Sequence, residues 1–444
     1  TQRSLGGHET FRGLLGVGMQ LMLYEHKQHL ISKLMANNMP RVRVSRSPRI
    51  TIDRFKAQNS PGAHNENTIL AQIMRSLDSN DKESRRQLYA DSEDKWWHVT
   101  YEGEQGQDMG GLFRDSLSSL ATECHRASVS DECVCPLFVQ VELFQVDQSG
   151  TKQLVASSLV PNPACDTSEA EQLYECLGQI MGACARGGER GDKGGEKLAV
   201  GLAPLVWKLL LGREMRWDEV AQLEPELHAG LDCILSARAP NGYKYTEAEF
   251  NGAYSDRYDF TVSFGASRPY REMELVAGGA SQKLSYRTRH DYVRLVKKAQ
   301  LAKYNTQIRA MRKGLLQYLP AEVMALWNGY DLESAVAGEP DVAVEKLKSE
   351  AEVGLTSVQT IWFWECVDAM TPAQRCKLLR FATGRSRLPV GQFHVKEGPK
   401  SRGDGALPNA ATCFFTIYVP TYSSQQIMSR QLIIAIETED FGTG

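Results

Sequence analysis

Cys413 is the residue whose type and setting best suit covalent chemistry. It is one of ten cysteines, and it lies where a proline-containing loop that begins at Leu407 meets a predicted aromatic-rich strand. Such junctions expose side chains, and rigid neighbours fix their direction. A thiolate is a strong nucleophile near neutral pH and forms thioesters. Cys413 is therefore a candidate acyl-carrying nucleophile, and the alternative is a small buried thiol.

Two other groupings could bind a metal or a phosphate, but neither has the required pattern. A glycine-rich loop at 102–111 lies between a predicted strand and a predicted helix, lacks Gly-Lys-Ser/Thr and carries acidic residues that would repel phosphate. We therefore expect a tight turn there. The spacing of a second group fits no standard zinc site, so we expect a chance cluster, with no metal and no cofactor; its members are Cys124, His125, Cys133 and Cys135.

The composition is that of a folded protein without general affinity for nucleic acid or membranes. The chain has 444 residues, 42% of them hydrophobic, and a formal net charge of -3, whereas nucleic-acid binders carry a basic excess. Its length is about three times that of a typical ~150-residue domain, which predicts two or more packed units. No apolar run approaches the ~20 residues needed to span a bilayer. The first residue is Thr1, so we expect a piece of a longer chain.

The cysteines also bear on where the protein resides. A chain of this size can build hydrophobic cores without disulfide bonds. The ten cysteines are irregularly spaced along the whole length. We therefore expect reduced thiols and a cytoplasmic or nuclear setting.

Hydrophobic patterns predict the elements that must hold Cys413 in place. Alternating apolar residues predict paired strands at 137–146 and 153–160. A helical period predicts helices at 169–185, 198–211, 290–319 and 423–436. Pro320 should end the third of these.

Two further segments have a composition of their own. The helical segment 290–319 carries a set of cations, which form either a solvated face or a surface that attracts an acidic partner. The small residues, glycine and proline of 335–340 predict a linker between two units. The cations are Lys297, Lys298, Arg309, Arg312 and Lys313.

Several segments, taken in order, resemble the HECT family of ubiquitin ligases. That family has its nucleophile in a Leu-Pro-x-x-x-Thr-Cys-Phe run followed by Pro-x-Tyr, and this chain has the run at 407–414 and Pro-Thr-Tyr at 420–422. Phe441 is fourth from the end, where the family usually has phenylalanine. Further family blocks are the acidic glycine loop at 101–111, Trp-Phe-Trp at 362–364, and Phe-Ala-Thr-Gly with Arg-Leu-Pro between 381 and 389.

The resemblance implies an α+β fold of two lobes joined by a hinge. Residues 48–336 would form a larger, mostly helical N-terminal lobe that binds a ubiquitin-conjugating enzyme. Residues 341–444 would form a smaller α/β lobe with the catalytic cysteine, and 337–340 would be the hinge. Residues 1–47 would be an N-terminal extension with one helix, which apolar spacing predicts around Leu30.

The implied activity is that of a ubiquitin-protein transferase whose partners are a conjugating enzyme, ubiquitin and a protein substrate. Cys413 would accept ubiquitin as a thioester and pass it to a substrate lysine. Thr412 would donate a hydrogen bond near the thioester, and Phe441 would help to position it. The conjugating enzyme would bind an apolar groove within 231–296, for which the candidate aromatic anchors are Tyr258, Phe260 and Tyr292.

Two alternatives stay open. Many family members have histidine two residues before the cysteine, whereas this chain has Ala411. The second hypothesis is therefore a HECT-fold scaffold of the ubiquitin pathway that is catalytically weak or inactive. The third is a cysteine hydrolase, which would need a histidine partner, and His394 is the nearest one in sequence.

Overall fold

The structure, a computed structural model, is of mixed α/β type, and most of its elements are helices, in agreement with the expected α+β class. None of the described helices combines the length and the apolar character that crossing a membrane requires. The structure describes residues 24–37, 48–59, 65–78, 96–104, 111–124, 136–146, 152–187, 196–264, 271–338, 342–383, 393–398, 400–411 and 415–437.

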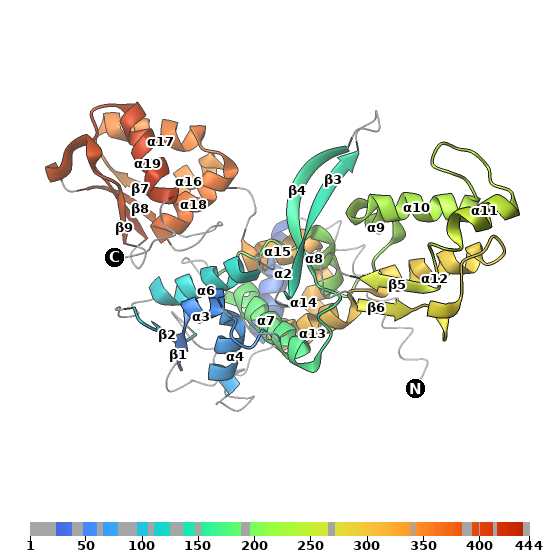
Figure 1. The fold of residues 1–444 in the computed structure, drawn as a ribbon. Helices are drawn as coiled ribbons and strands as arrows, with labels where there is room; N and C mark the ends of the chain where they lie inside the picture. The colour runs from blue at the N-terminus through green and yellow to red at the C-terminus, as the bar shows by residue number, and fades with distance from the viewer. Residues whose placement is uncertain are drawn as a thin grey trace.

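The largest hydrophobic core is here called the central core. It contains buried residues from Ile31 to Val220 and from Tyr304 to Ala337. Its strands pair as a parallel pair, β1 with β2, and as an antiparallel hairpin, β3 with β4. The hairpin rises from the middle of the molecule in Figure 1. The elements are α2 (Tyr24–Asn37), β1 (Arg49–Ile52), α3 (Arg54–Asn59), α4 (Ile69–Asp78), β2 (His98–Tyr101), α6 (Gly111–Cys124), β3 (Phe138–Val146), β4 (Lys152–Pro161), α7 (Ser168–Gly187), α8 (Pro204–Leu210), α9 (Trp217–Leu223), α13 (Asn305–Leu315), α14 (Ala321–Leu326) and α15 (Gly329–Ala337).

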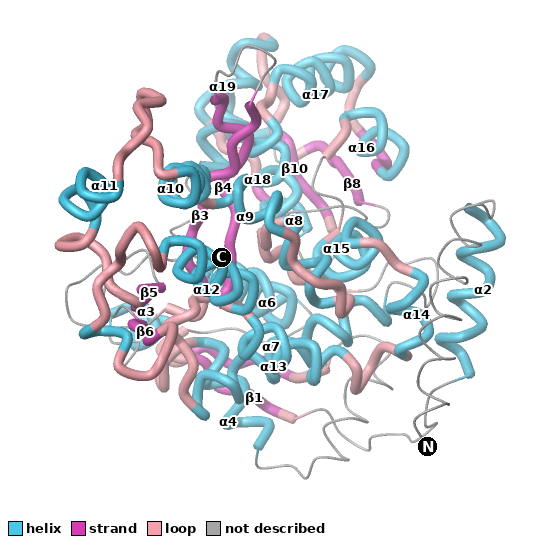
Figure 2. Tube along the Cα trace, turned by 90° about the vertical axis from the view of Figure 1, so that its right-hand side faces the viewer, coloured by secondary structure: helices cyan, strands magenta, loops and turns pink. Residues whose placement is uncertain are grey.

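Two glycines let α7 and α13 cross at the centre of this core. The helices lie side by side in Figures 1 and 2. A Cβ atom on Gly178 would lie 2.0 Å from the carbonyl oxygen of Met311, and one on Gly314 would lie 2.1 Å from that of Glu175. Only glycine fits such a close approach of two backbones.

A second, separate core, here called the outer core, forms within residues 217–302. Thr246 begins one of its helices with a capping box, in which Thr246 and Glu249 satisfy each other's backbone N–H groups. Strands β5 and β6 pair antiparallel. The elements are α10 (Pro225–Ser236), α11 (Glu247–Tyr254), β5 (Thr261–Phe264), β6 (Arg271–Glu274), the 3-10 helix η1 (Gly279–Ser281) and α12 (Arg289–Ala302).

The third core, here called the C-terminal core, contains buried residues from Val342 to Ile436. Its four-stranded sheet has the order β7-β8-β10-β9; β8 is parallel to β7 and β10, and β9 is antiparallel to β10. The elements are α16 (Val344–Glu350), β7 (Ala351–Gly354), α17 (Ser357–Ala369), α18 (Pro372–Thr383), β8 (Phe393–Glu397), η2 (Lys400–Gly405), β9 (Asn409–Ala411), β10 (Thr416–Val419) and α19 (Gln425–Glu437).

The expected single helix over 290–319 is wrong, because two helices occupy the segment. Helix α12 ends at Ala302 and α13 begins at Asn305. The chain leaves the outer core and enters the central core here, and it buries both Lys303 and Tyr304 at the break. The stop before Pro320 is confirmed, since α13 ends at Leu315.

The expected helix over 198–211 is only partly right, because residues 198–203 are not helical and Leu202 forms a bridge with Leu159. Pro204, which lacks an N–H, then opens α8. The strand pair at 137–160 and the helices near 169–185 and 423–436 are confirmed. Residues 335–337, expected in the linker, form the last turn of α15 instead, and Val336 and Ala337 are fully buried.

Candidate active site

Cys413 belongs to the short connection between β9 and β10, and the described ends of that connection are firmly placed. Ala411 pairs with Thr416 across the two antiparallel strands. Phe415 has a φ of 49°, in the left-handed region that bulky residues rarely adopt. Such strain persists only where surrounding contacts impose it, and it is common at functional sites. Thr412, Cys413 and Phe441 themselves lie outside the described residues.

Phe415 is held by contacts from two directions. The backbone N–H of His394 donates to its carbonyl oxygen at 2.7 Å. The guanidinium of Arg114, on α6, lies 4.6 Å from the centre of its ring, within the range of a cation–π interaction. Arg114 Nε in turn donates to Glu196 at 3.2 Å, and both of these side chains are mostly buried. The residue two places after Cys413 is thus tied to the central core.

A row of four residues crosses the whole C-terminal sheet beside this connection. Strand register aligns Glu352 with His394, His394 with Thr416, and Thr416 with Ala411. Residues in register project to the same face of a sheet. His394 Nδ1 lies 2.9 Å from Glu352 Oε2, which leaves Nε2 as the remaining polar atom of the ring.

The loop that precedes β9 is fastened to the start of α19. The Asp404 carboxylate accepts hydrogen bonds from the backbone N–H of Ser423 at 2.8 Å and from its hydroxyl at 2.6 Å. These bonds hold the pKa of Asp404 below its ordinary value. Tyr422 donates its hydroxyl proton to the carbonyl of Ala406 at 2.7 Å, and burial raises its pKa. The segment leading to Leu407-Pro408 is therefore positioned by side chains that follow β10.

The aromatic anchors expected between 231 and 296 converge on the outer core, but not all in the same way. Tyr258 and Tyr292 line a groove of about 410 Å³ between α10, α12 and β5. Burial raises the pKa of Tyr292 to about 12, so its hydroxyl stays neutral in the physiological range. Phe260 is only 2% exposed and packs edge-to-face against Tyr292 at 5.4 Å, so it supports the groove from within the core.

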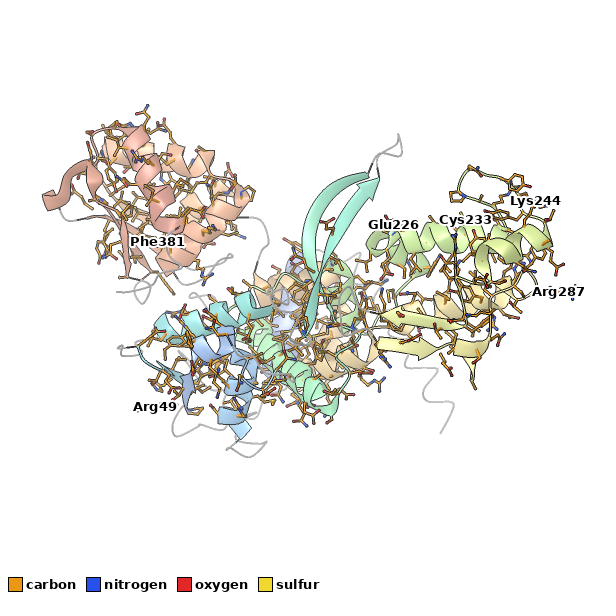
Figure 3. All side chains as sticks on the ribbon, viewed as in Figure 1. Arg49, Glu226, Cys233, Lys244, Arg287 and Phe381 are labelled. Carbon is orange, nitrogen blue, oxygen red and sulfur yellow. The ribbon has the colours of Figure 1, made fainter. Side chains whose placement is uncertain are left out.

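Other apolar side chains of this groove include those of Leu227 and Leu231. Its charged lining is mostly acidic, with one cation, and consists of Glu224, Glu226, Asp259 and Arg257. Figure 3 labels Glu226 at the start of α10. A groove with aromatic walls and acidic surroundings fits a partner that presents apolar side chains flanked by cations.

No local pattern pointed to Arg114 or Glu352 as residues near the connection between β9 and β10. Both reach the site through tertiary pairing of segments that are far apart in the chain. Of the four residues expected to form a chance cluster, Cys124 is buried and burial raises its pKa, whereas His125, Cys133 and Cys135 lie outside the described residues. No cluster of potential metal ligands occurs among the residues that the structure describes.

Comparison with known proteins agrees with the resemblance. Residues 134–443 match the HECT-domain (ubiquitin-transferase) family, a span that covers more than half of the chain and includes Cys413. The chain is 25% identical to the E3 ubiquitin-protein ligase HERC2 of Mus musculus. The matched region covers 98% of this chain and 9% of that relative.

Two further relatives show the same relationship. Identity is 23% to the E3 ubiquitin-protein ligase HUWE1 of Mus musculus, over 81% of this chain and 8% of the relative. It is 25% to the E3 ubiquitin-protein ligase UPL2 of Arabidopsis thaliana, over 78% of this chain and 9% of the relative. The chain thus spans less than a tenth of the length of these curated relatives. From its matched span, the chain belongs to the HECT family of ubiquitin transferases.

Proposed function

We propose that this chain is a ubiquitin-transfer module that accepts ubiquitin from a conjugating enzyme as a thioester on Cys413 and passes it to a substrate lysine. The observation that carries the proposal is the family match over 134–443, within which Cys413 stands in the nucleophile's run of residues. The described flanks, Ala411 and Phe415, agree with a connection held at both ends.

The chemistry needs placement more than a strong base. The Cys413 thiolate attacks the carbonyl carbon of the incoming thioester, a new C–S bond forms, and the thiolate of the conjugating enzyme leaves and takes up a proton. The exchange replaces one thioester with another, so its free-energy change is small and correct orientation dominates the rate. A lysine amine then attacks the new thioester, an amide forms, and the Cys413 thiolate leaves.

We also propose the two-lobe arrangement, with residues 48–336 as the N-terminal lobe, 337–340 as the hinge and 341–444 as the C-terminal lobe. The separate hydrophobic cores support it, because Val336 is buried in the central core and Val342 in the C-terminal core. In Figure 1 the C-terminal elements and the outer core lie on opposite sides of the central elements. Helix α2, within the extension 1–47, packs Ile31 and Met35 into the central core.

The groove of the outer core is the proposed site for the conjugating enzyme, with Tyr258 and Tyr292 as anchors and Phe260 beneath them. The partners are then that enzyme, ubiquitin and a protein substrate. The reduced thiols expected for this chain support a cytoplasmic or nuclear setting.

A thioester assay tests the proposal. The chain is incubated with activating enzyme, a conjugating enzyme, ubiquitin and ATP, and adducts are separated with and without reducing agent. We expect a reducing-agent-sensitive adduct that Cys413→Ala abolishes and that Cys376→Ala, at a half-buried cysteine of the same core, leaves intact. Absence of an adduct with every competent conjugating enzyme would favour the inactive scaffold that Ala411 suggests.

The hydrolase alternative has one observation in its favour. His394, on strand β8 beside β10, pairs with Glu352 on strand β7. A histidine oriented by a carboxylate is what a cysteine hydrolase requires. Cleavage of a ubiquitin C-terminal ester without any conjugating enzyme would support this alternative, and its absence would exclude it.

A further inference from the structure

A second groove, here called the basic groove, lies beside α12 and has a volume of about 880 Å³. It is bounded by α12, by α13 and by the segment that follows α8. Its lining differs from that of the groove with Tyr258 and Tyr292, although both use the same helix. Tyr292, Val296 and Gln300 line that other groove, whereas Val293, Lys297 and Leu301 line the basic groove. The two are therefore separate surfaces on different faces of α12.

The basic groove concentrates positive charge in a chain whose net charge is -3. Glu214 is the one carboxylate among the residues that line it. On α12 the cations Arg294 and Lys298 are four residues apart, so they share one helix face. Six lysines and arginines contribute, namely Arg213, Arg294, Lys297, Lys298, Arg309 and Arg312.

Three of these cations contact backbone carbonyls or an aromatic ring of the protein. Arg312 Nη1 donates to the carbonyl of Leu210 at 2.7 Å, and Arg213 Nη2 donates to that of Trp327 at 2.8 Å. Lys297 Nζ lies 4.6 Å from the ring centre of Trp217. These contacts fix the walls of the groove and hold positive charge there.

Lys298 and Arg309 are available to a ligand. Both are exposed, one on α12 and one on α13. Among the described residues neither forms an ion pair, in contrast to Arg294, which pairs with Asp291, and Lys313, which pairs with Glu175. Two unneutralised cations on facing helices attract an anionic group placed between them.

The floor of the groove indicates which kind of anion fits. It is formed by Met215, Val293, Leu301 and Ile308. A small polyphosphate would gain nothing from these apolar side chains. Single-stranded nucleic acid binds through aromatic stacking, and no Phe, Tyr or Trp lines the groove. A peptide that combines carboxylates with aliphatic side chains uses both the rim and the floor.

We propose that the basic groove binds a short acidic segment of a partner protein in which glutamates or aspartates alternate with aliphatic residues. Residues 290–301 of α12 extend about 16 Å at ~1.5 Å per residue, which accommodates about five residues of extended peptide. Because the groove for the conjugating enzyme carries acidic residues and this groove carries basic ones, the two select partners of opposite charge.

The test measures binding directly and does not depend on ubiquitin transfer. The probe is a fluorescein-labelled peptide of alternating glutamate and leucine, long enough to span the groove, and the readout is fluorescence anisotropy with the whole chain. We expect saturable binding that weakens as salt rises, because the contacts are exposed to screening. In the double variant Lys298→Glu/Arg309→Glu, Kd should rise about tenfold or more.

A matched control is Lys244→Glu/Arg430→Glu, which makes the same change in net charge at exposed positions outside the groove. Figure 3 labels Lys244 at the far end of the outer core. The control should bind the peptide as the unchanged chain does, and both double variants should keep the unfolding temperature and the Cys413 thioester.

Three results would overturn the proposal. They are an absence of saturable binding, equal weakening in the two double variants, and binding of inositol hexakisphosphate in place of the glutamate–leucine peptide. An alternating lysine–leucine peptide should show no binding to this groove.

Discussion

We infer that His394 serves the second half-reaction proposed for Cys413, the transfer of ubiquitin to lysine. Its Nδ1 faces Glu352 at 2.9 Å, and its backbone binds Phe415, two residues after the cysteine. A carboxylate on Nδ1 fixes the tautomer in which Nε2 can accept a proton. Since Ala411 occupies the position where relatives often have histidine, His394 is the candidate group to take a proton from the incoming lysine.

We expect His394→Gln to slow discharge of ubiquitin from Cys413 to lysine about a hundredfold, the size typical of general-base assistance. Thioester formation from the conjugating enzyme should change little, because exchange between thiols needs no such base. Single-turnover assays of the two half-reactions separate these effects. Glu352→Gln should produce a smaller loss in discharge alone, and equal rates for all three proteins would assign the pair a structural role.

Arg114 links three parts of the protein through one side chain. It pairs with Glu196, where both side chains are mostly buried, and lies against the Phe415 ring. We expect Arg114→Ala to lower the free energy of unfolding by about 1–2 kcal/mol, because Glu196 loses its partner and a cation–π contact is lost. Arg216→Ala, which breaks a fully exposed pair with Asp218, should leave stability unchanged. Denaturant titration measures both, and similar values would contradict this assignment.

At the scale of helices, the crossing of α7 and α13 depends on the absence of two side chains. A Cβ on Gly314 would meet the carbonyl oxygen of Glu175 at 2.1 Å, and backbone cannot move aside as a flexible side chain can. We expect Gly314→Ala to destabilise the protein by about 1–3 kcal/mol or more through overpacking. Gly252→Ala, in α11 with nothing within 4 Å of its Cβ, should be neutral or stabilising. Calorimetric unfolding distinguishes the two, and equal effects would be inconsistent with a tight crossing.

Elements that depend on residues close together in the chain were predictable from the sequence. Features that depend on tertiary contacts between distant segments were not. Alternation over 137–160 and the apolar period of 423–436 gave the right strands and helix, because both patterns act within a few residues. The break at Lys303 and Tyr304 arises where one core ends and another begins, which no local pattern records. The same holds for Arg114 beside Phe415, whereas Cys413 could be recognised from its neighbours in sequence.

At the scale of the whole molecule, the fold must bring together two candidate sites that lie on different hydrophobic cores. The groove proposed for the conjugating enzyme is built on the outer core, whereas Cys413 belongs to the connection between two strands of the C-terminal core. Thioester exchange requires the reacting atoms to approach within about 3–3.5 Å. Ala337 is fully buried in the central core and Val342 in the C-terminal core, so the chain passes from one core to the other between these two residues. We therefore infer that a reorientation of the C-terminal core would pivot on the segment between them.

We expect replacement of residues 339–341 by three prolines, which leaves the C-cap Gly338 of α15 in place, to slow transfer from the conjugating enzyme to Cys413 about tenfold or more. A proline run is a semi-rigid spacer, so it restricts the orientations that the C-terminal core can reach. Binding of the conjugating enzyme, measured by calorimetry, should be unchanged because Tyr258 and Tyr292 are untouched. Replacement of the same three residues by Gly-Ser-Gly provides the matched control and should keep the transfer rate. A proline variant that transfers ubiquitin as fast as the glycine–serine variant would show that productive encounter does not depend on this segment, and the hinge would then have to lie elsewhere in the chain.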